Sequence, residues 1–258
     1  MKIKFYKYQG AGNDFVMIDN RDGNFPVNKD TIEHICDRNF GIGGDGLILL
    51  QNDSDTDFRM VYFNSDGNES TMCGNGGRCI VRFAHDLEVT DENMTFNAID
   101  GLHHAVVDGE TIRLQMIDIK EVEDHDKYLF MNTGSPHHVE FVDNVKNVDV
   151  YKKGKKIRNG APYYETGSNV NFVEVLPNQT LKIRTYERGV EDETLACGTG
   201  ITAAAIASYI RGFVKDNNIN VEALGGKLSV NFDEKNNTFE NVWLNGPAKR
   251  VFEGEIEI

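Results

Sequence analysis

The sequence predicts an α+β protein made of two pseudo-symmetric halves, each a mostly antiparallel sheet wrapped around a central helix. A Cys-Gly-polar-Gly motif followed by an apolar run occurs twice, at Cys73 and Cys197, which are 124 residues apart in a chain of 258. Short strand patterns outnumber helical ones, and the turns between them are short, which favours antiparallel pairing over βαβ winding. We therefore expect an internal duplication with halves at residues 1–118 and 119–246, and a tail at about 247–258 that packs on the first half.

In the first half, two helices are expected among short strands. Residues 10–14 interrupt two strand patterns and are most simply a tight hairpin turn. The dinucleotide-binding fingerprint is matched in residue pattern by Gly41-Ile42-Gly43-Gly44-Asp45-Gly46. The structural context does not match, because a helix precedes this segment and a strand follows it, the reverse of what that site requires. The expected helices cover about 28–39 and 74–85, and the expected strands cover 3–8, 15–18, 47–50, 58–63, 94–96, 104–107 and 111–116.

The second half repeats this order after an acidic stretch at residues 118–127, which marks the expected boundary. Its helix at about 198–211 is apolar nearly all round, which is typical of a central buried helix. The basic run at 152–156 is interpreted as a solvated loop. The expected strands cover 128–131, 138–144, 169–175, 181–186, 220–223 and 227–232, followed by a β-rich tail at 239–258.

Composition limits the class of protein. A net charge of −14 and a pI near 4.9 argue against a nucleic-acid-binding surface, which needs a basic face. Residues 1–9 alternate lysine with apolar residues, which predicts a strand and not a signal peptide, and no apolar run is long enough to span a membrane. Four cysteines do not make a disulfide framework in a chain of this length. We expect a cytoplasmic protein that binds neither nucleic acid nor membranes.

The two motifs are suited to reactive thiols. The first turn of a helix leaves N–H groups unpaired and carries roughly half a positive charge. A cysteine there has its pKa depressed from about 8.5, so that thiolate is available at neutral pH. Flanking glycines allow a ligand to approach the backbone, and Asn75 and Thr199 are candidate capping side chains. Two such helix ends would provide two thiols and an anion-binding site.

Other residues of the reactive types receive structural interpretations. Cys36 and Cys79 are expected to pack in the core, as free cysteines usually do. The histidine pairs His103-His104 and His137-His138 lack acidic partners at metal-ligand spacing, so no metal site is expected. Arg78 and Arg82 are either helix-surface charges or interdomain ion pairs, and the sequence does not choose between these.

Taken in order, several motifs resemble the diaminopimelate epimerase family. They span residues 12–200 and cover both halves: Gly12-Asn13-Asp14-Phe15, Gly41–Gly46, Asn64-Ser65-Asp66-Gly67, Met72–Cys79, Gly134-Ser135-Pro136-His137, Asn169-Val170-Asn171-Phe172, and Glu187-Arg188-Gly189 with Ala196–Gly200. Each motif alone is weak, whereas the ordered set is specific.

The resemblance implies a cofactor-independent epimerase that interconverts LL- and meso-diaminopimelate for lysine and cell-wall synthesis, with substrate in a cleft between two domains. By position, Cys73 and Cys197 would be the catalytic bases, and His137 and Glu187 would lie beside the reacting centre. The substrate-binding residues implied in the same way are Asn13, Asn64, Gly74, Asn75, Asn169, Glu187, Arg188, Gly198 and Thr199. No cofactor or metal is implied, and whether the chain forms a homodimer stays open.

The sequence departs from some family members in two residues and in the length of one segment, and these departures would bear on the distal end of the substrate. Gly46 and Ser135 stand where some members carry glutamine and asparagine, and the segment from Glu187 to Cys197 is one residue longer than in some relatives. None of these departures touches the two thiols.

Three other functions remain open. A two-cysteine racemase acting on proline or hydroxyproline would use the same chemistry, although the Asn64–Gly67 motif and the Glu187-Arg188 pair favour diaminopimelate. A thiol oxidoreductase could use facing cysteines, but no Cys-x-x-Cys motif is present. A protein that only binds its ligand would have the same site but would catalyse no reaction.

Because both thiols are expected at one substrate, oxidation should join Cys73 to Cys197 and abolish activity. Mass spectrometry of the oxidised protein, with turnover measured before and after reduction, checks this expectation. Full activity in the oxidised protein that carries the bond would contradict it.

Overall fold

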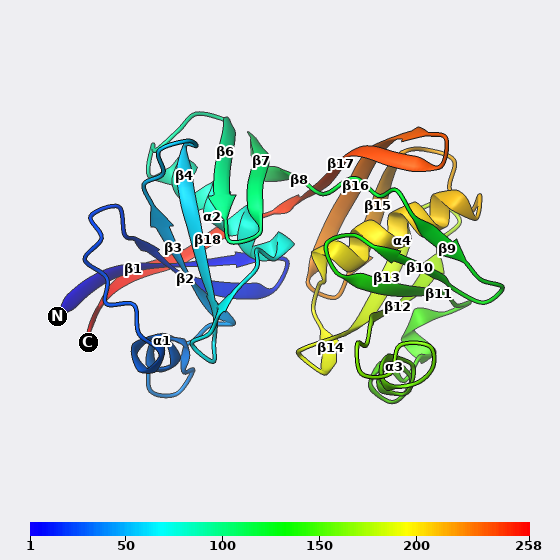
Figure 1. The fold of residues 1–258 in the computed structure, drawn as a ribbon, viewed down its shortest axis with the longest axis horizontal. Helices are drawn as coiled ribbons and strands as arrows, with labels where there is room; N and C mark the ends of the chain where they lie inside the picture. The colour runs from blue at the N-terminus through cyan, green and yellow to red at the C-terminus, as the bar shows by residue number, and fades with distance from the viewer. The chain divides into compact units, whose positions relative to one another are not determined.

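The computed structural model describes residues 1–258, which divide into two compact units. Unit 1 comprises Met1–Leu114 with Gly246–Ile258, and unit 2 comprises Gln115–Asn245. Four α-helices and eighteen strands are formed (Figure 1). None of the helices is both long and apolar enough to cross a membrane.

Unit 1 is a mixed, mostly antiparallel sheet. Only the β2–β3 and β4–β6 pairs are parallel, and the short β5 (Glu69–Ser70) adds to β4. In order across the sheet, the strands are β18 (Lys249–Glu257), β1 (Lys2–Gly10), β2 (Asn13–Asp19), β3 (Gly46–Gln51), β4 (Phe58–Asn64), β6 (Asn93–Ala98), β7 (Gly101–Asp108) and β8 (Thr111–Gln115).

Unit 2 has the same strand order with the same directions, the parallel pairs being β11–β12 and β13–β15. The short β14 (Asp192–Thr194) adds to β13 as β5 adds to β4. In order, the strands are β9 (Val122–Asp124), β10 (Leu129–Asn132), β11 (Pro136–Phe141), β12 (Asn169–Val175), β13 (Leu181–Glu187), β15 (Asn218–Ala223), β16 (Gly226–Lys235) and β17 (Thr238–Pro247).

The helices repeat as the strands do. α1 (Lys29–Cys36) and α3 (Val150–Asn159) each connect the first parallel pair of their unit. α2 (Gly74–Asp86) and α4 (Gly198–Ile210) each connect the second pair, have 13 residues, and are buried along most of their length. The predicted duplicated α+β fold is therefore confirmed, with one central helix in each half.

The outer strand of each sheet follows the last strand of the other unit's sheet in the chain. β9 follows β8 in the chain but pairs with β10, and β18 follows β17 but pairs with β1 along nearly its whole length (Figure 1, red beside blue). The C-terminal tail thus belongs to unit 1. The units divide between Leu114 and Gln115, four residues before the expected boundary.

Local chemistry explains several element boundaries. Ala11 and Gly12 have φ angles of +51° and +92°, which make the two-residue turn between β1 and β2. Asn28 caps α1 by accepting from the Thr31 N–H at 2.9 Å. That helix ends at Cys36, earlier than the expected 39, because Asp37 adopts an extended conformation.

The interpretation of residues 152–156 as a loop was wrong, because they lie in α3. Asp149 caps this helix by accepting from the Lys152 N–H at 3.0 Å. Four lysines dominate the composition of α3, so the narrow face that packs on the sheet is not evident from the sequence. Val150 and Gly154 are buried on that face. A side chain on Gly154 would place its Cβ 2.3 Å from the Cβ of Tyr186, so glycine is required for this close approach.

Replacing Gly154 with alanine should therefore destabilise unit 2. The added methyl meets the buried Tyr186 near its backbone, where little can move, and overpacking of this kind costs about 1–3 kcal/mol. Urea unfolding measures the loss. The exposed Lys152→Ala in the same helix is the control and should change stability by no more than about 0.5 kcal/mol. Equal stabilities for the two variants would contradict this packing argument.

Candidate active site

Cys73 and Cys197 occupy equivalent positions, each the N-cap of its unit's central helix. Cys73 has extended backbone angles, and its Sγ accepts from the Gly76 N–H at 3.2 Å. A side chain on Gly76 would place its Cβ 3.1 Å from that sulfur, so the glycine leaves the thiol its space. Cys197 is also extended, and its Sγ lies 3.4 Å from Thr199 Oγ1.

Neither helix start carries an acidic side chain in its first turn. No side chain of the first turn therefore offsets the partial positive charge of these ends, and such ends stabilise anions. The structure thus gives both thiols the helix-start environment that the motifs predict.

The other two cysteines are buried, as expected. Burial raises the pKa of Cys36 to about 12 and raises the pKa of Cys79 well above the usual range. Both therefore stay protonated at neutral pH. Neither is suited to proton transfer.

In unit 2, a chain of hydrogen bonds fixes the protonation of His137 and leads to Cys197. The His138 carbonyl can only accept, and it accepts from Asn171 Nδ2 at 3.0 Å. The same amide nitrogen therefore donates to His137 Nδ1, also at 3.0 Å. Nδ1 is then the acceptor, the proton is on Nε2, and Nε2 donates to Thr199 Oγ1 at 2.9 Å.

This arrangement leaves the Thr199 hydroxyl proton available to Cys197. Oγ1 already accepts from His137, so the O–H can donate to the sulfur 3.4 Å away. Burial, together with the positive charge of Arg188, lowers the pKa of His137 to about 3. The imidazole is therefore neutral at physiological pH. It orients the hydroxyl without adding charge.

Asn171 was missed as a candidate residue, although a signal for it exists. It lies two residues after Asn169 in a strand, and alternation places the two side chains on one face. Its Oδ1 accepts from Thr185 Oγ1 at 3.0 Å, so all of its polar atoms are engaged in a buried network.

The predicted binding residues Asn169 and Arg188 come together. Asn169 Oδ1 accepts from the Arg188 N–H at 2.8 Å, and its Nδ2 donates to Ser135 Oγ at 2.8 Å. The guanidinium of Arg188 donates to the Thr166 carbonyl at 3.0 Å and is otherwise near solvent. Glu187 accepts from Thr194 Oγ1 at 2.9 Å, which ties β13 to β14.

In unit 1, Asn13 is held from both ends of its amide. Its Nδ2 donates to Asp45 Oδ2 at 2.9 Å, and its Oδ1 accepts from Asn75 Nδ2. Asn75, buried in the first turn of α2, thereby connects Asn13 to the helix that Cys73 caps.

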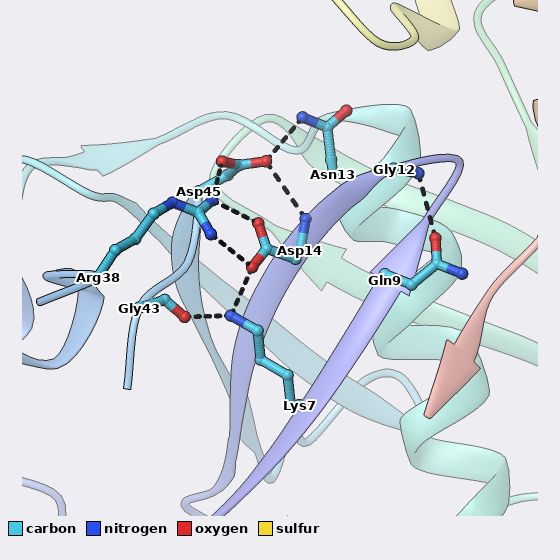
Figure 2. Close-up of polar contacts among 8 residues, drawn as sticks. All are labelled: Lys7, Gln9, Gly12, Asn13, Asp14, Arg38, Gly43 and Asp45. Atoms are coloured by element: carbon cyan, nitrogen blue, oxygen red, sulfur yellow. Dashed lines mark hydrogen bonds and ion pairs between the residues drawn. The ribbon is translucent and has the colours of Figure 1, made fainter. Parts of the chain in front are cut away.

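Asp45 belongs to a network of charges that anchors Asn13 (Figure 2). Arg38 donates to Asp45 at 2.8 Å and to Asp14 at 2.6 Å. The buried Lys7 pairs with Asp14 at 2.7 Å and donates to the Gly43 carbonyl. Lys7 and Arg38 had no recognisable signal in the sequence, because lysine and arginine side chains are usually solvated.

Position 46 and Asn64 are neighbours in the β3–β4 register. A side chain on Gly46 would place its Cβ 2.4 Å from the Phe63 carbonyl oxygen, so only glycine fits this backbone at position 46. Asn64 ends β4, and its carbonyl accepts from the Gly67 N–H at 3.0 Å in the following turn.

The surface-charge alternative for Arg78 was wrong, because this side chain is fully buried. It donates to the Gly74 carbonyl, to Asn75 Oδ1 and to the Pro247 carbonyl. Arg82 is partly exposed and donates to the Gly109 carbonyl, as a surface charge on the helix can. No group of three or more His, Cys, Asp or Glu side chains is placed to hold a metal ion.

Comparison with known proteins gives one consistent result. The family model described as diaminopimelate epimerase matches residues 5–117 and 129–251. The diaminopimelate epimerase of Flavobacterium psychrophilum is 57% identical over 256 residues, covering 98% of this chain and 100% of the relative. The enzyme of that name from Chlorobaculum tepidum is 43% identical, with 96% and 99% covered.

Solved structures with low sequence identity share the fold. A PhzF-family protein of Bacillus anthracis aligns with a TM-score of 0.78 at 14% identity, covering 100% of both chains. A hydroxyproline epimerase of Agrobacterium vitis aligns with a TM-score of 0.69 at 13% identity, covering 99% of this chain and 92% of that one. The motifs, the duplicated fold and the match along both halves agree, and the chain belongs to the diaminopimelate epimerase family.

Proposed function

We propose that this protein interconverts LL-2,6-diaminopimelate and meso-diaminopimelate without an organic cofactor, by a two-base mechanism that uses Cys73 and Cys197. The observation that carries the proposal is the pair of thiols at equivalent helix starts in two repeats of identical topology. The names of relatives that match nearly the whole chain support the choice of substrate.

Inversion of a carbon centre requires that a proton leave one face and another arrive on the opposite face. One group must be basic while the other is still protonated, and a thiolate and a thiol meet this need near neutral pH. Because the two thiols share one substrate in this mechanism, their pKa values belong to the pair. The reverse reaction uses the same groups with exchanged roles.

Carbanion charge is the main energetic problem, since the charge spreads onto the α-carboxylate as the α-proton leaves. Backbone N–H groups at the two helix starts are preorganised donors for that carboxylate, and this would be the largest catalytic contribution. The donors proposed are at Gly74, Asn75, Gly198 and Thr199. None of them needs to reorganise, because the helices are fixed in the core.

The remaining site residues receive binding roles. The guanidinium fork of Arg188 suits a carboxylate. The amides of Asn13, Asn64 and Asn169 and the carboxylate of Glu187 would orient the substrate's ammonium and carboxylate groups. His137 assists by orienting the Thr199 hydroxyl. Roles in lysine and peptidoglycan precursor synthesis, a cytoplasmic location and a possible homodimer remain predictions.

Proline or hydroxyproline is the alternative substrate class. The hydroxyproline epimerase neighbour shares the fold, but at 13% identity that likeness carries no substrate. The relatives at 57% and 43% identity are named for diaminopimelate and favour it.

Incubation of the reduced protein with LL-diaminopimelate in D₂O, without added cofactor, tests the proposed function. We expect solvent deuterium at the α position together with meso product, followed by NMR and chiral chromatography. Cys73→Ser and Cys197→Ser should each nearly abolish turnover while the fold is kept, and the buried Cys36→Ala is the matched control that stays active. Exchange with proline alone would change the substrate, and turnover near the wild-type rate in either serine variant would exclude the two-base assignment.

Thr199→Val should raise the pKa of Cys197, because it removes the hydroxyl that can donate to the sulfur. A hydrogen bond to a charged group contributes about 1.5–3 kcal/mol, which corresponds to a shift of about one pKa unit or more. The pH dependence of Cys197 alkylation, followed peptide by peptide, measures the shift. Thr202→Val is the matched control, since its hydroxyl donates to the Gly198 carbonyl at 3.1 Å instead. Identical profiles for wild type and Thr199→Val would show that the hydroxyl does not act on the thiol.

A further inference from the structure

Arg158 joins two separate segments of unit 2. Its side chain lies in the last turn of α3 and is largely buried, with 16% exposed. Its Nε donates to Glu191 Oε1 at 2.9 Å, in the turn that follows β13, and its Nη1 donates to the Tyr164 carbonyl at 3.4 Å, in the loop that follows α3. A largely buried guanidinium is costly unless its donors find acceptors, and here one of the acceptors is charged.

The turn that follows β13 carries Arg188 and is closed by Glu191. The Glu191 N–H donates to the Glu187 carbonyl at 2.8 Å, so residues 187–191 form one turn. Gly189 and Glu191 have φ angles of +94° and +59° in it. A left-handed conformation is uncommon for a residue other than glycine, so the one at Glu191 needs support from its surroundings.

The carboxylate of Glu191 supplies that support. Besides the bond from Arg158, Oε1 accepts from the Gly189 N–H at 3.1 Å, and Oε2 accepts from the Tyr186 O–H at 3.2 Å. Burial raises the pKa of Glu191, but the hydrogen bonds and charge of its donors outweigh this effect and lower the pKa overall, so the group is an anion at neutral pH. One carboxylate therefore ties the turn to α3 and to β13.

The loop that follows α3 holds the guanidinium of Arg188. Nη1 of Arg188 donates to the Thr166 carbonyl at 3.0 Å. Gly167, with a φ angle of +63°, comes next in this loop, and a side chain there would collide with Nη1 of Arg158. The loop thus accepts from both arginines, at carbonyls two residues apart.

Arg188 held in this way is close to the residues that lead to Cys197. Its N–H donates to Asn169 Oδ1 at 2.8 Å, and its charge lowers the pKa of His137, which bonds Thr199. The side chain is exposed, and Nη1 is the guanidinium atom that bonds the protein. The other N–H donors of the fork can therefore bind a carboxylate that arrives from solvent.

We propose that Arg158 and Glu191 are positioning residues for Arg188: they join the loop at 160–167 to the turn at 187–191 and so hold the guanidinium where it binds a carboxylate of the substrate. This inference rests on the substrate proposed above. Neither residue needs to touch the substrate, since both act through the two segments that hold Arg188. A guanidinium that is already ordered does not have to be immobilised by the substrate, which favours binding.

Steady-state kinetics of the reduced full chain with LL-diaminopimelate test the inference. Glu191→Ala removes all three bonds of the carboxylate and should raise KM by about three- to tenfold, because the substrate must then order Arg188, while kcat stays within about twofold. Arg158→Gln weakens the same pair from the other partner and should give the same split. Glu191→Gln keeps an oxygen acceptor for Arg158 and should keep most of the affinity. Asp192→Ala, the matched control, removes an exposed carboxylate from the same segment and should leave KM unchanged.

Amide hydrogen exchange of the peptide that covers residues 187–191, in the ligand-free protein, is the second measurement. Exchange should be faster in Glu191→Ala, because the Gly189 N–H loses its acceptor and the turn loses its tie to α3, and it should be unchanged in Asp192→Ala.

Unchanged exchange in a folded Glu191→Ala, or faster exchange with the wild-type KM, would overturn the inference. Arg158→Gln decides by the same criteria if Glu191→Ala fails to fold. Exchange needs no turnover, so the two proposals fail separately. A wild-type protein that does not convert diaminopimelate would overturn the proposed function, whereas a turn that is equally ordered without Glu191 would overturn this inference alone.

Discussion

The fold depends on two helices that begin inside the protein. A buried helix start leaves N–H groups that must find acceptors, and here the cap is a cysteine followed by glycines. At Cys73 the sulfur accepts from the Gly76 N–H. Bulkier or acidic residues in the first turn would fill the space or neutralise the helix end. The requirement for an open, positively polarised end therefore explains the composition of both motifs.

Around these helices, the polar side chains are held by their neighbours. In unit 1 the amide of Asn13 lies between Asp45 and Asn75, and in unit 2 the ring of His137 lies between Asn171 and Thr199. In both cases the donor and acceptor pattern allows one orientation only. Such fixed groups can bind a charged ligand with little reorganisation, which is the advantage that a preorganised site has over water.

The sequence predicted the duplication, the two central helices and the buried cysteines because each has a local signal. The pairing of β18 with β1 joins residues about 250 positions apart, so only the β-rich tail hinted at it. α3 was missed because its lysines dominate the composition while its packed face is narrow. Arg78 was misjudged for a similar reason: arginine is usually solvated, and its burial is decided by tertiary packing that no local pattern encodes.

A duplicated fold suits a reaction that must act on both faces of one carbon, because the repeat supplies the same kind of helix start twice. Perfect equivalence, however, would leave the two thiols competing for one proton with no preference. Inversion needs opposite roles at the same moment, so a difference between the repeats is useful as long as it does not disturb the shared backbone. The repeats do differ behind their first turns, where the side chain of Arg78 bonds the Gly74 carbonyl of one helix and that of Thr202 bonds the Gly198 carbonyl of the other. The repeat thus supplies the helix geometry twice, while the side chain behind each first turn differs.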